Sequence, residues 1–562
     1  MKEELEEYLD HKSDEYNGKT LLPRSFFRDN FRDNHTEVLD KGTSHALQIN
    51  DLSKLISENT ITKTGKFLVD YSIRNPLISV DNIKAKHEAL DEIKSNDKIR
   101  RSVENILSKV KQYEGGTDNV VDVFNDNGGA AEFLNNSKSD YKTQSDIRAI
   151  LGSLPRWAKN IPEPESEYLR KLTQDIGKNL RNSSSHKLGK GPIFRHLLKG
   201  KIYGLEEIAK EHPIVSPLPF NPLPFQAIPI LMGFAGPMTP LFYILPSEGV
   251  SPDAKVGMAF GALLASGLGT SIGIWIGVLR DQYNFFRPMR KVFRDEPGAV
   301  NAYKAIGCLD ELLAYDRFRK QLPNASLPEV LDPERHEFFA EGLVNPLQSQ
   351  KIDDYIPNDV ALNNGQRLTF LTGPNSGGKT SLGKSIAQAQ VLAQIGCYVP
   401  ATKAKISIAD KIFYQVGNND TLDDDEGGLG TQFRETKRAL FSGTTKSLVI
   451  VDDLIEGTTF DEKTRHTKDQ LYGFLHKGTN TVYISHHFEL AKHFRDKGLG
   501  NFWQVDFDGE KPTHKIVPGI STNSHSDVVA KRVGFDEEAI TKHLIKEGYL
   551  IPGQNLDDFK YN

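Results

Sequence analysis

The chain has 562 residues, which is enough for several domains at roughly 100–200 residues each. Lys and Arg total 70 against 75 Asp and Glu, so no strong overall charge points to nucleic acid or to an acidic partner. The two cysteines, Cys308 and Cys397, lie far apart in sequence. This excludes a disulfide framework and indicates a reducing compartment.

The N-terminal part of the chain divides into a charged segment and a helical region. Residues 1–44 begin MKEELEEYLDHKSDEY and contain no apolar core of a signal peptide. Residues 45–212 follow, and Gly65–Ile93 within them has apolar residues at helical intervals. The pattern predicts an all-α domain. A generic helical bundle is the simplest interpretation of it.

Two apolar segments predict a transmembrane hairpin within residues 213–280. The first is densest at Phe225–Leu245 (225–245), and the second is Val256–Leu279 (256–279). Each can cross a hydrocarbon layer of about 30 Å as a helix, which takes about 20 residues. Cationic residues flank the pair on both sides and predict that both flanks are cytoplasmic: Arg195, Lys199, Lys201, Lys210, Arg280, Arg287, Arg290 and Lys291.

The first apolar segment also contains residues that disfavour a regular helix. Pro229, Pro237 and Pro240 would break or kink it, although neighbouring helices can satisfy the freed carbonyls in a membrane. An apolar hairpin buried in a soluble oligomer is the alternative interpretation. After the pair, residues 281–327 predict returning helices, with helical spacing in Ala305–Phe318.

Residues 372–381 read TGPNSGGKTS and predict a phosphate-binding loop. A short apolar strand, Arg367–Leu371, precedes the loop, and Ser381–Ala393 after it has helical spacing. In such a loop the backbone N–H groups surround phosphates at a helix N-terminus. The residues expected to hold ATP here are Gly373, Pro374, Asn375, Ser376, Gly377, Gly378, Lys379, Thr380 and Ser381.

The side chains of the loop and of a later strand predict a Mg²⁺ site. Lys379 is expected to reach the β- and γ-phosphates, and the Thr380 hydroxyl to ligate Mg²⁺. Ser447–Asp453 is an apolar strand that ends in two carboxylates. Asp452 is placed to hold the Mg²⁺ shell, and Asp453 to polarise the attacking water, although its side chain is one methylene shorter than glutamate.

A third strand ends in a pair of histidines. Thr481–Ile484 runs into Ser485-His486-His487. A histidine just past a strand end in this type of fold can sense the γ-phosphate, and His486 is the candidate. A structural histidine is the alternative.

These motifs resemble the MutS-type ATPases of DNA mismatch repair. The similar segments are TGPNSGGKTS, YVPA at Tyr398–Ala401, LVIVDDLIEGTT, YISHHFEL and the C-terminal SHSDVVAKRVGFDEEAI. The resemblance covers roughly Pro328–Ile540, and weaker similarity at Gly65–Ile93 and Ala305–Phe318 extends it to the helical core. It implies an α/β P-loop NTPase domain of the ABC/MutS type over residues 328–540, ending in a helix-turn-helix, with a tail at 541–562.

The resemblance also implies a homodimer with composite ATP sites. Gly428–Glu435 is similar to the segment that faces the partner's nucleotide, and Gly430 and Thr431 are the expected contacts. Gly430 stands where the family has a serine, and Glu456 where it has an arginine. Together with Asp453 these departures favour slow hydrolysis or an altered contact between subunits; subfamily drift with normal activity is the alternative.

Two further departures concern partners. Nothing before Gly65 matches the mismatch-reading domains, and that stretch contains no Phe-x-Glu triplet of the kind that forms the mismatch wedge. The predicted membrane hairpin lies where the family's lever arms run to a DNA-gripping clamp. The sequence therefore predicts a multi-pass membrane ATPase with its ATPase domain in the cytoplasm, acting on the lipid bilayer.

Three rival functions stay open. In the first, a membrane-tethered clamp of the mismatch-repair type binds double-stranded DNA through the flanking basic residues. In the second, a transporter-like ATPase uses the apolar helices as a path, but these contain no ionisable residue to mark an ion route. In the third, a nucleotide-gated scaffold binds ATP and hardly hydrolyses it.

Overall fold

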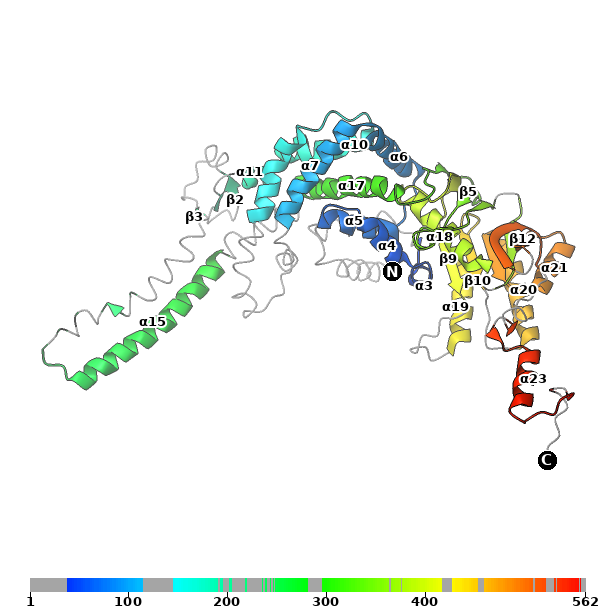
Figure 1. Ribbon diagram of the computed structural model, residues 1–562. Coiled ribbons are helices and arrows are strands. Elements are labelled where there is room, and N and C mark those ends of the chain that lie inside the picture. Colours follow the sequence, from blue (N-terminus) through cyan, green and yellow to red (C-terminus); the bar gives the residue numbers. More distant parts are fainter. Residues whose placement is uncertain are drawn as a thin grey trace. The chain divides into compact units, whose positions relative to one another are not determined.

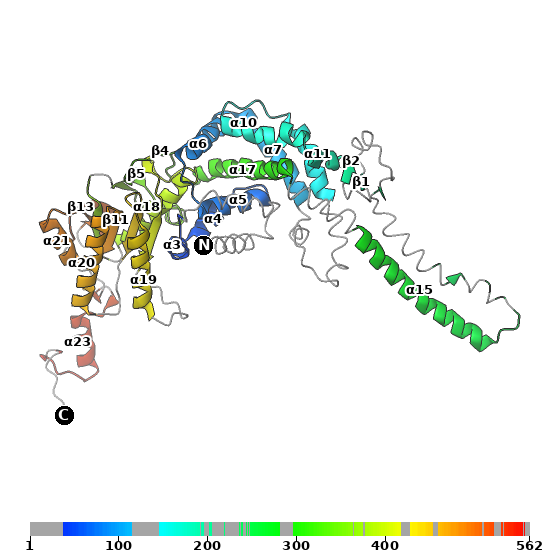
Figure 2. The same cartoon turned by 180° about the vertical axis from the view of Figure 1, so that it is seen from behind.

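A computed structural model describes the chain in segments (Figures 1 and 2). Its contacts define a helical unit, drawn from Ile56–Asp70 and Glu88–Asp316, and a sheet unit, drawn from Thr36–Leu55, Tyr71–His87 and Arg317–Asn562. The described residues are 38–114, 145–190, 193–195, 202–204, 218–219, 248–281, 296–362, 365–374, 377–416, 427–452, 459–508, 511–521, 530–531, 533–554 and 556, with single positions between 235 and 246. Several predictions fall outside them: most of segment 225–245, Asn375, Ser376, Asp453, Glu456 and residues 524–529.

Long helices dominate the first half of the described chain. In the helical unit, α17 runs between α5 on one side and α7 and α10 on the other in both views (Figures 1 and 2). The helices in chain order are α3 Lys41–Ala46, α4 Ile49–Ser57, α5 Lys63–Arg74, α6 Val80–Ser95, α7 Asp97–Glu114, 145–158, α10 Glu167–Gln174 with a π-helical turn Asp175–Asn179, α11 Ser184–Gly189, α15 Pro252–Asp281 and α17 Pro297–Arg319.

Two glycines and a buried carboxylate set the crossing of α5 and α17. A Cβ on Gly65 would lie within 2.5 Å of the Cβ of Asp310, and one on Gly307 would lie 2.9 Å from Leu68 Cδ2. Asp310 is fully buried and accepts hydrogen bonds from the backbone N–H groups of Ile61 and Thr62, at 2.9 and 2.7 Å. Because these N–H groups precede α5, the carboxylate of α17 satisfies donors at the helix start.

Glu114 at the end of α7 adds a second buried carboxylate to the same helix start. It accepts from Lys63 N at 2.7 Å and from the Thr64 hydroxyl at 2.8 Å. Helices α7 and α17 are therefore tied to the first turn of α5 by hydrogen bonds as well as by apolar packing.

The second apolar segment of the sequence forms a helix, as predicted. Helix α15 is apolar and long enough over Pro252–Ile272 to cross a membrane, and 6% of that stretch is buried. Its exposed side chains include Phe260 at 65% and Leu268 at 67%. Near it in sequence, three short strands form an antiparallel sheet of order β2-β1-β3: β1 Ile193–Arg195, β2 Ile202–Gly204 and β3 Leu218–Pro219.

The sheet unit contains a six-stranded sheet of order β13-β12-β7-β11-β10-β9, in which only β13 is antiparallel to its neighbour. Parallel strands buried on both faces read as continuous apolar runs, as in LVIVD and NTVYIS. The strands are β7 Leu368–Thr372, β9 Ile412–Val416, β10 Leu448–Asp452, β11 Asn480–Ser485, β12 Asn501–Asp508 and β13 Lys511–Pro518.

Alternate strand residues bury opposite faces of this sheet. Phe370, Val449, Val451 and Tyr483 pack in one core with apolar residues of three helices. These helices are α19 Gly427–Ser442, α20 Phe460–Lys477 and α21 Phe488–Asp496.

Helix α18, Lys379–Gln394, packs through Gly383 against the other face. A Cβ on Gly383 would lie 2.6 Å from Ile484 Cδ1 and 3.4 Å from Ile450 Cγ2. The strand and helix predicted around the phosphate loop are confirmed as β7 and α18, and the glycine sets how closely α18 approaches the strands.

A second sheet and segments from the start of the chain complete the sheet unit. The sheet has the order β4-β8-β5-β6. Its strands are β4 Glu329–Leu331, β5 Phe338–Leu343, β6 Asn358–Ala361 and β8 Lys403–Ser407, and the unit's last helix is α23 Glu537–Lys546.

At the edge of the large sheet, Leu39 forms a parallel bridge with Ile412 of β9. The Thr43 hydroxyl of α3 accepts a hydrogen bond from Tyr414 N at 3.2 Å. Residues 38–46 therefore cover a strand that lies about 370 positions later in the sequence.

Candidate nucleotide site

The register of the parallel strands brings three predicted motifs to one edge of the sheet. Thr372 of β7 pairs with Ser485 of β11, and Ile484 of β11 pairs with Asp452 of β10. The phosphate loop, the Asp452 carboxylate and His486 therefore follow adjacent strand ends. The carboxyl edge of such a sheet is where α/β folds bind ligands.

Backbone conformation and a neighbouring valine explain the glycines of the loop. Gly378 has φ +89° and precedes α18, in the left-handed region where glycine is favoured. A Cβ on Gly373 or Gly377 would lie 2.6 or 2.7 Å from Val505 Cγ2. The side chain of Val505, from β12, therefore packs against the loop and holds it close to the sheet.

Lys379 lies inside the loop that it follows. Its side chain is buried, and its ammonium donates hydrogen bonds to the carbonyl oxygens of Gly373 and Pro374, both at 2.8 Å. A buried ammonium needs such acceptors to offset its desolvation. The lysine is thus held within the turn of backbone that would surround a phosphate.

A tyrosine joins the two predicted Mg²⁺ ligands. Tyr414 Oη, from β9, lies 3.3 Å from Asp452 Oδ2 and 3.3 Å from the carbonyl oxygen of Thr380. Burial, and next the adjacent Asp452 carboxylate, raise the pKa of Tyr414 well above its usual value, so the hydroxyl stays protonated. Asp452 itself is 5% exposed.

Ser381, predicted to contact nucleotide, uses its hydroxyl within the fold. Its Oγ lies 2.8 Å from Tyr355 Oη and donates to Gln348 Oε1 at 2.5 Å. These bonds fasten the first turn of α18 to the segment 345–355, which precedes β6. The structure therefore gives the Ser381 side chain a positioning contact.

The remaining predicted residues lie at exposed or half-buried positions. His486 is exposed, and its ring centroid lies 4.6 Å from that of half-buried His487. Gly430 and Thr431 are half-buried in the first turn of α19, which packs against β9 and α20.

Lys384 is a functional candidate that the sequence analysis missed. It lies one helical turn after Thr380 on α18, and its ammonium donates a hydrogen bond to Gln48 Oε1 at 3.3 Å. Burial lowers the pKa of Lys384, although the Asp452 carboxylate acts in the opposite direction. Nothing in the loop pattern singles out this lysine. The signal lay in its helical spacing from Thr380, because residues four apart share a helix face.

His514 is a second candidate that was missed. A Cβ built on Gly378 would lie 3.5 Å from His514 Nδ1, so the imidazole lies beside the loop. Its φ is +60°, which is uncommon outside glycine. Asn358 fixes the strand around it by donating to His514 O at 3.1 Å and accepting from Ile516 N at 2.8 Å. The sequence carries no local signal for this contact.

Comparisons with known proteins agree with this geometry. The family profile of MutS domain V matches residues 369–546. DNA mismatch repair protein MutS of Caldanaerobacter subterraneus subsp. tengcongensis is 25% identical over 523 residues, covering 87% of this chain and 57% of that protein. The corresponding protein of Petrotoga mobilis is 33% identical over 203 residues, covering 35% and 25% of the two chains.

A similar match comes from a Prochlorococcus marinus protein of the same name. It is 34% identical over 279 residues, covering 46% of this chain and 30% of that protein. The chain spans little more than half the length of the first of these relatives and about a third or less of the others. Residues 369–546 are therefore similar to MutS domain V, and most of the chain is similar to part of a MutS protein.

Proposed function

We propose that the chain binds Mg²⁺-ATP with residues 373–381 and hydrolyses it. The observation that carries the proposal is the meeting of the phosphate loop, Asp452 and His486 at one sheet edge. In the sequence the first and last of these motifs are more than a hundred residues apart. This meeting, within residues similar to MutS domain V, supports an ATP site over a chance glycine-rich turn.

The donor set at this edge fits Mg²⁺-ATP. Hydroxyl and carboxylate oxygens are the protein ligands that Mg²⁺ prefers, and Thr380 and Asp452 supply one of each. When bound, Mg²⁺ neutralises charge on the β- and γ-phosphate oxygens. Tyr414 would orient the Asp452 carboxylate through its 3.3 Å contact.

Lys379 would exchange its two loop carbonyls for phosphate oxygens, and the backbone N–H groups around it would hold those oxygens. Asp453 and His486 are the proposed groups around the attacking water. His514 would contact the nucleotide where it leaves the loop, because its imidazole lies beside Gly378.

The proposed active form is a homodimer. Gly430 and Thr431 lie near the start of α19 in the sheet unit, and in the proposal they close the ATP site of the partner. Closure would then move the helical unit, in line with nucleotide-driven change in a two-state protein.

We also propose that α15 anchors the protein in a membrane. Its apolar length and its exposed Phe260 and Leu268 support this role, since large exposed apolar surfaces mark interaction sites. The other half of the hairpin, 225–245, stays a prediction. A DNA-binding clamp is the second candidate, because the curated relatives are DNA mismatch repair proteins.

The test of hydrolysis is ATP turnover by the purified full chain. Lys379→Ala and Asp452→Asn should each lower turnover by at least about 10²-fold if they hold phosphate and Mg²⁺. Lys405→Ala, on an exposed strand position of the same unit, is the matched control and should leave turnover unchanged. Equal turnover in all four proteins would overturn the proposal.

The two candidate partners are separated by extraction and by DNA. A membrane-anchored ATPase should resist carbonate, dissolve in detergent and turn over ATP independently of duplex DNA. A carbonate-soluble protein whose turnover responds to duplex DNA, with binding that weakens steeply with salt, would instead support the clamp.

A further inference from the structure

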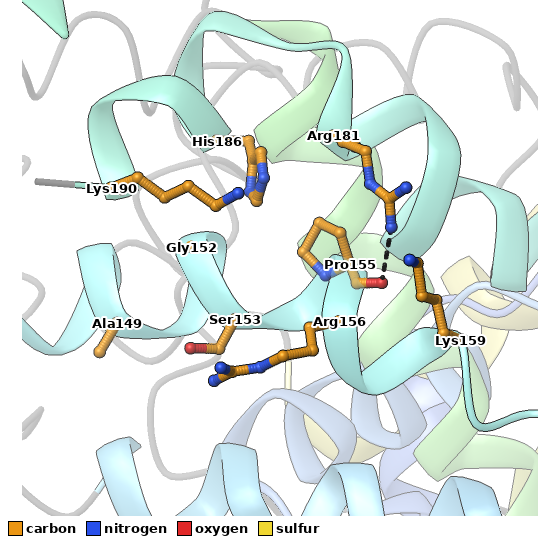
Figure 3. A pocket seen from close by; sticks show the side chains of 10 residues that line it. Ala149, Gly152, Ser153, Pro155, Arg156, Lys159, Arg181, His186 and Lys190 are labelled. Atoms are coloured by element: carbon orange, nitrogen blue, oxygen red, sulfur yellow. Dashed lines mark hydrogen bonds between the residues drawn. The ribbon is translucent and has the colours of Figure 1, made fainter. Parts of the chain in front are cut away.

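A hollow of about 610 Å³ lies in the helical unit, and none of its described lining residues belongs to the proposed ATP site. Helix 145–158 lines one side of it and residues 181–190, which include α11, line the other (Figure 3). The described residues that line it include no carboxylate and four cationic side chains: Arg156, Lys159, Arg181 and Lys190.

The wall of the hollow is a close contact between two backbones. A Cβ on Gly152 would lie 2.8 Å from the carbonyl oxygen of Gly189, and one on Gly189 would lie 2.7 Å from Gly152 N. Only glycine allows the two segments to approach so closely. The separation of the cationic residues on the two segments is therefore fixed by the backbone.

A buried histidine adds a second tie between the segments. His186 is 4% exposed, and its Nδ1 lies 2.9 Å from the carbonyl oxygen of Leu151. A carbonyl oxygen only accepts, so Nδ1 carries the proton. Arg148 Nε donates to Leu188 O at 3.1 Å and strengthens the same contact. The hollow thus has a hydrogen-bonded wall, and its four cationic side chains are exposed.

No ion pair within the described residues joins one of the four cations to a carboxylate. Arg181 donates one hydrogen bond to Pro155 O at 3.3 Å, which uses one of the five N–H donors of its guanidinium. Cations gathered in one concave place repel each other and attract an anion.

We propose that this hollow binds a small molecule that carries phosphate. Guanidinium groups match phosphate oxygens with paired hydrogen bonds and ammonium groups bind them as point charges. Arg181 and Lys159 extend toward one another from the two sides of the hollow (Figure 3), so that one phosphate can lie between them. The Ser153 hydroxyl adds a neutral donor. The volume falls in the range of about 300–1,000 Å³ typical of small-molecule sites, which is large for inorganic phosphate alone and fits an organic phosphate.

The phosphate can come from a free metabolite or from a lipid headgroup, and the two share this recognition chemistry. Duplex DNA is disfavoured because its phosphates lie on a convex surface, whereas the cations here surround a hollow. The proposal does not depend on ATP hydrolysis, and its failure would leave the proposed function untouched.

The experiment uses the full chain with Lys379→Ala as background, so that the phosphate loop contributes little to phosphate binding. Tripolyphosphate is titrated calorimetrically at low salt into this protein, into a variant that adds Lys159→Gln and Arg181→Gln, and into a control that adds Arg101→Gln. Arg101 is an exposed arginine of the same unit that pairs with Asp97. Co-flotation with phosphatidylcholine vesicles, with and without phosphatidylglycerol, tests the lipid source.

We expect the Kd for tripolyphosphate to rise at least about tenfold in the double pocket variant and to stay unchanged in the Arg101→Gln control. All three proteins could bind tripolyphosphate weakly while only the pocket variant loses flotation with phosphatidylglycerol vesicles. That result would support the lipid headgroup as the source of the phosphate. Equal binding of both probes by pocket variant and control would overturn the proposal. So would loss of duplex DNA binding alone, which would make the hollow part of a DNA interface. Equal melting temperatures of the ligand-free proteins show that the variants are folded.

Discussion

At the scale of single residues, the position of Tyr414 has a measurable consequence. Its hydroxyl contacts both the Asp452 carboxylate and the Thr380 carbonyl at 3.3 Å. We expect Tyr414→Phe to weaken Mg²⁺ activation of ATP turnover several-fold, on the order of 1 kcal/mol for one lost hydrogen bond. A Mg²⁺ titration of turnover measures this effect.

Tyr472→Phe is the matched control, because Tyr472 Oη bonds His493, away from the site. It should leave the Mg²⁺ dependence unchanged. An unchanged Mg²⁺ dependence in Tyr414→Phe would mean that the tyrosine only fills space between β9 and α18.

A second residue, His336, links protonation to the stability of the sheet unit. Its Nε2 lies 3.1 Å from Gln390 Oε1, and its Nδ1 lies 3.1 Å from Asn480 Nδ2. The neutral ring with its proton on Nε2 satisfies both neighbours, whereas a second proton on Nδ1 would face the Asn480 amide donor. Burial is the main cause that lowers the pKa of His336 to about 4 from 6.5.

Because the unfolded chain binds this proton more tightly, stability should fall as pH drops from about 6.5 toward 4 and level off below. The loss from His336 is about 3 kcal/mol at most. His87, with its pKa lowered to about 4 mainly by burial, acts in the same direction. We expect His336→Gln to remove about half of this pH dependence, measured by denaturant unfolding between pH 4 and 7.

Exposed His543 supplies the control for this measurement. His543→Gln should retain the slope of the wild-type protein. If the free energy of unfolding of His336→Gln falls with pH as steeply as that of the wild-type protein, other groups cause the pH dependence.

At the scale of elements, the first turn of α5 depends on carboxylates from two other helices. Asp310→Ala removes the acceptor for Ile61 and Thr62 and leaves buried N–H groups without it. We expect a loss of about 2–4 kcal/mol in the free energy of unfolding of the helical unit. Asp91→Ala, at an exposed position of α6, should change it by less than about 0.5 kcal/mol. If both variants unfold with similar free energies, water accepts the hydrogen bonds of Ile61 and Thr62 in place of the Asp310 carboxylate.

Element by element, the sequence predicted the local parts of the site and none of the contacts between distant strands. The strand Leu368–Thr372 and the helix Lys379–Gln394 follow from apolar runs and helical spacing around a glycine-rich loop. Val505 and His514 approach the same loop from β12 and β13. Their contacts depend on strand order and on a positive φ at a histidine, and no short-range pattern encodes either.

The sequence also predicted a helix over 256–279, and α15 spans it. Apolar length alone does not distinguish a membrane helix from a helix that packs on another protein. Membrane insertion therefore stays a proposal.

At the scale of the whole molecule, residues 38–46 contribute to the stability of the sheet unit. Leu39 bridges β9, and Thr43 accepts from Tyr414 N, so residues 38–46 pair with an edge strand that would otherwise be exposed. We expect a fragment of residues 317–562 to aggregate, since unpaired strand edges associate with other chains. A peptide of residues 36–57 added in trans should raise its melting temperature and solubility.

A peptide with Leu39→Asp is the control and should have a weaker effect, because a carboxylate would then replace a side chain that is 5% exposed. If the fragment is equally soluble without any peptide, the unpaired edge of β9 does not cause aggregation.

The bridge between Leu39 and Ile412 also bears on how the protein is made on the ribosome. Residues 36–55 leave the exit tunnel before the rest of the sheet unit, and their partner strand follows more than 350 residues later. At about 5–20 residues per second, this early segment waits on the order of tens of seconds before its partner exists. The helical unit can fold in that interval, because much of it is synthesised in between. Closing the long loop is slow for topological reasons, so the nascent apolar segment 38–56 is the part of the chain where chaperone binding during synthesis should be sought.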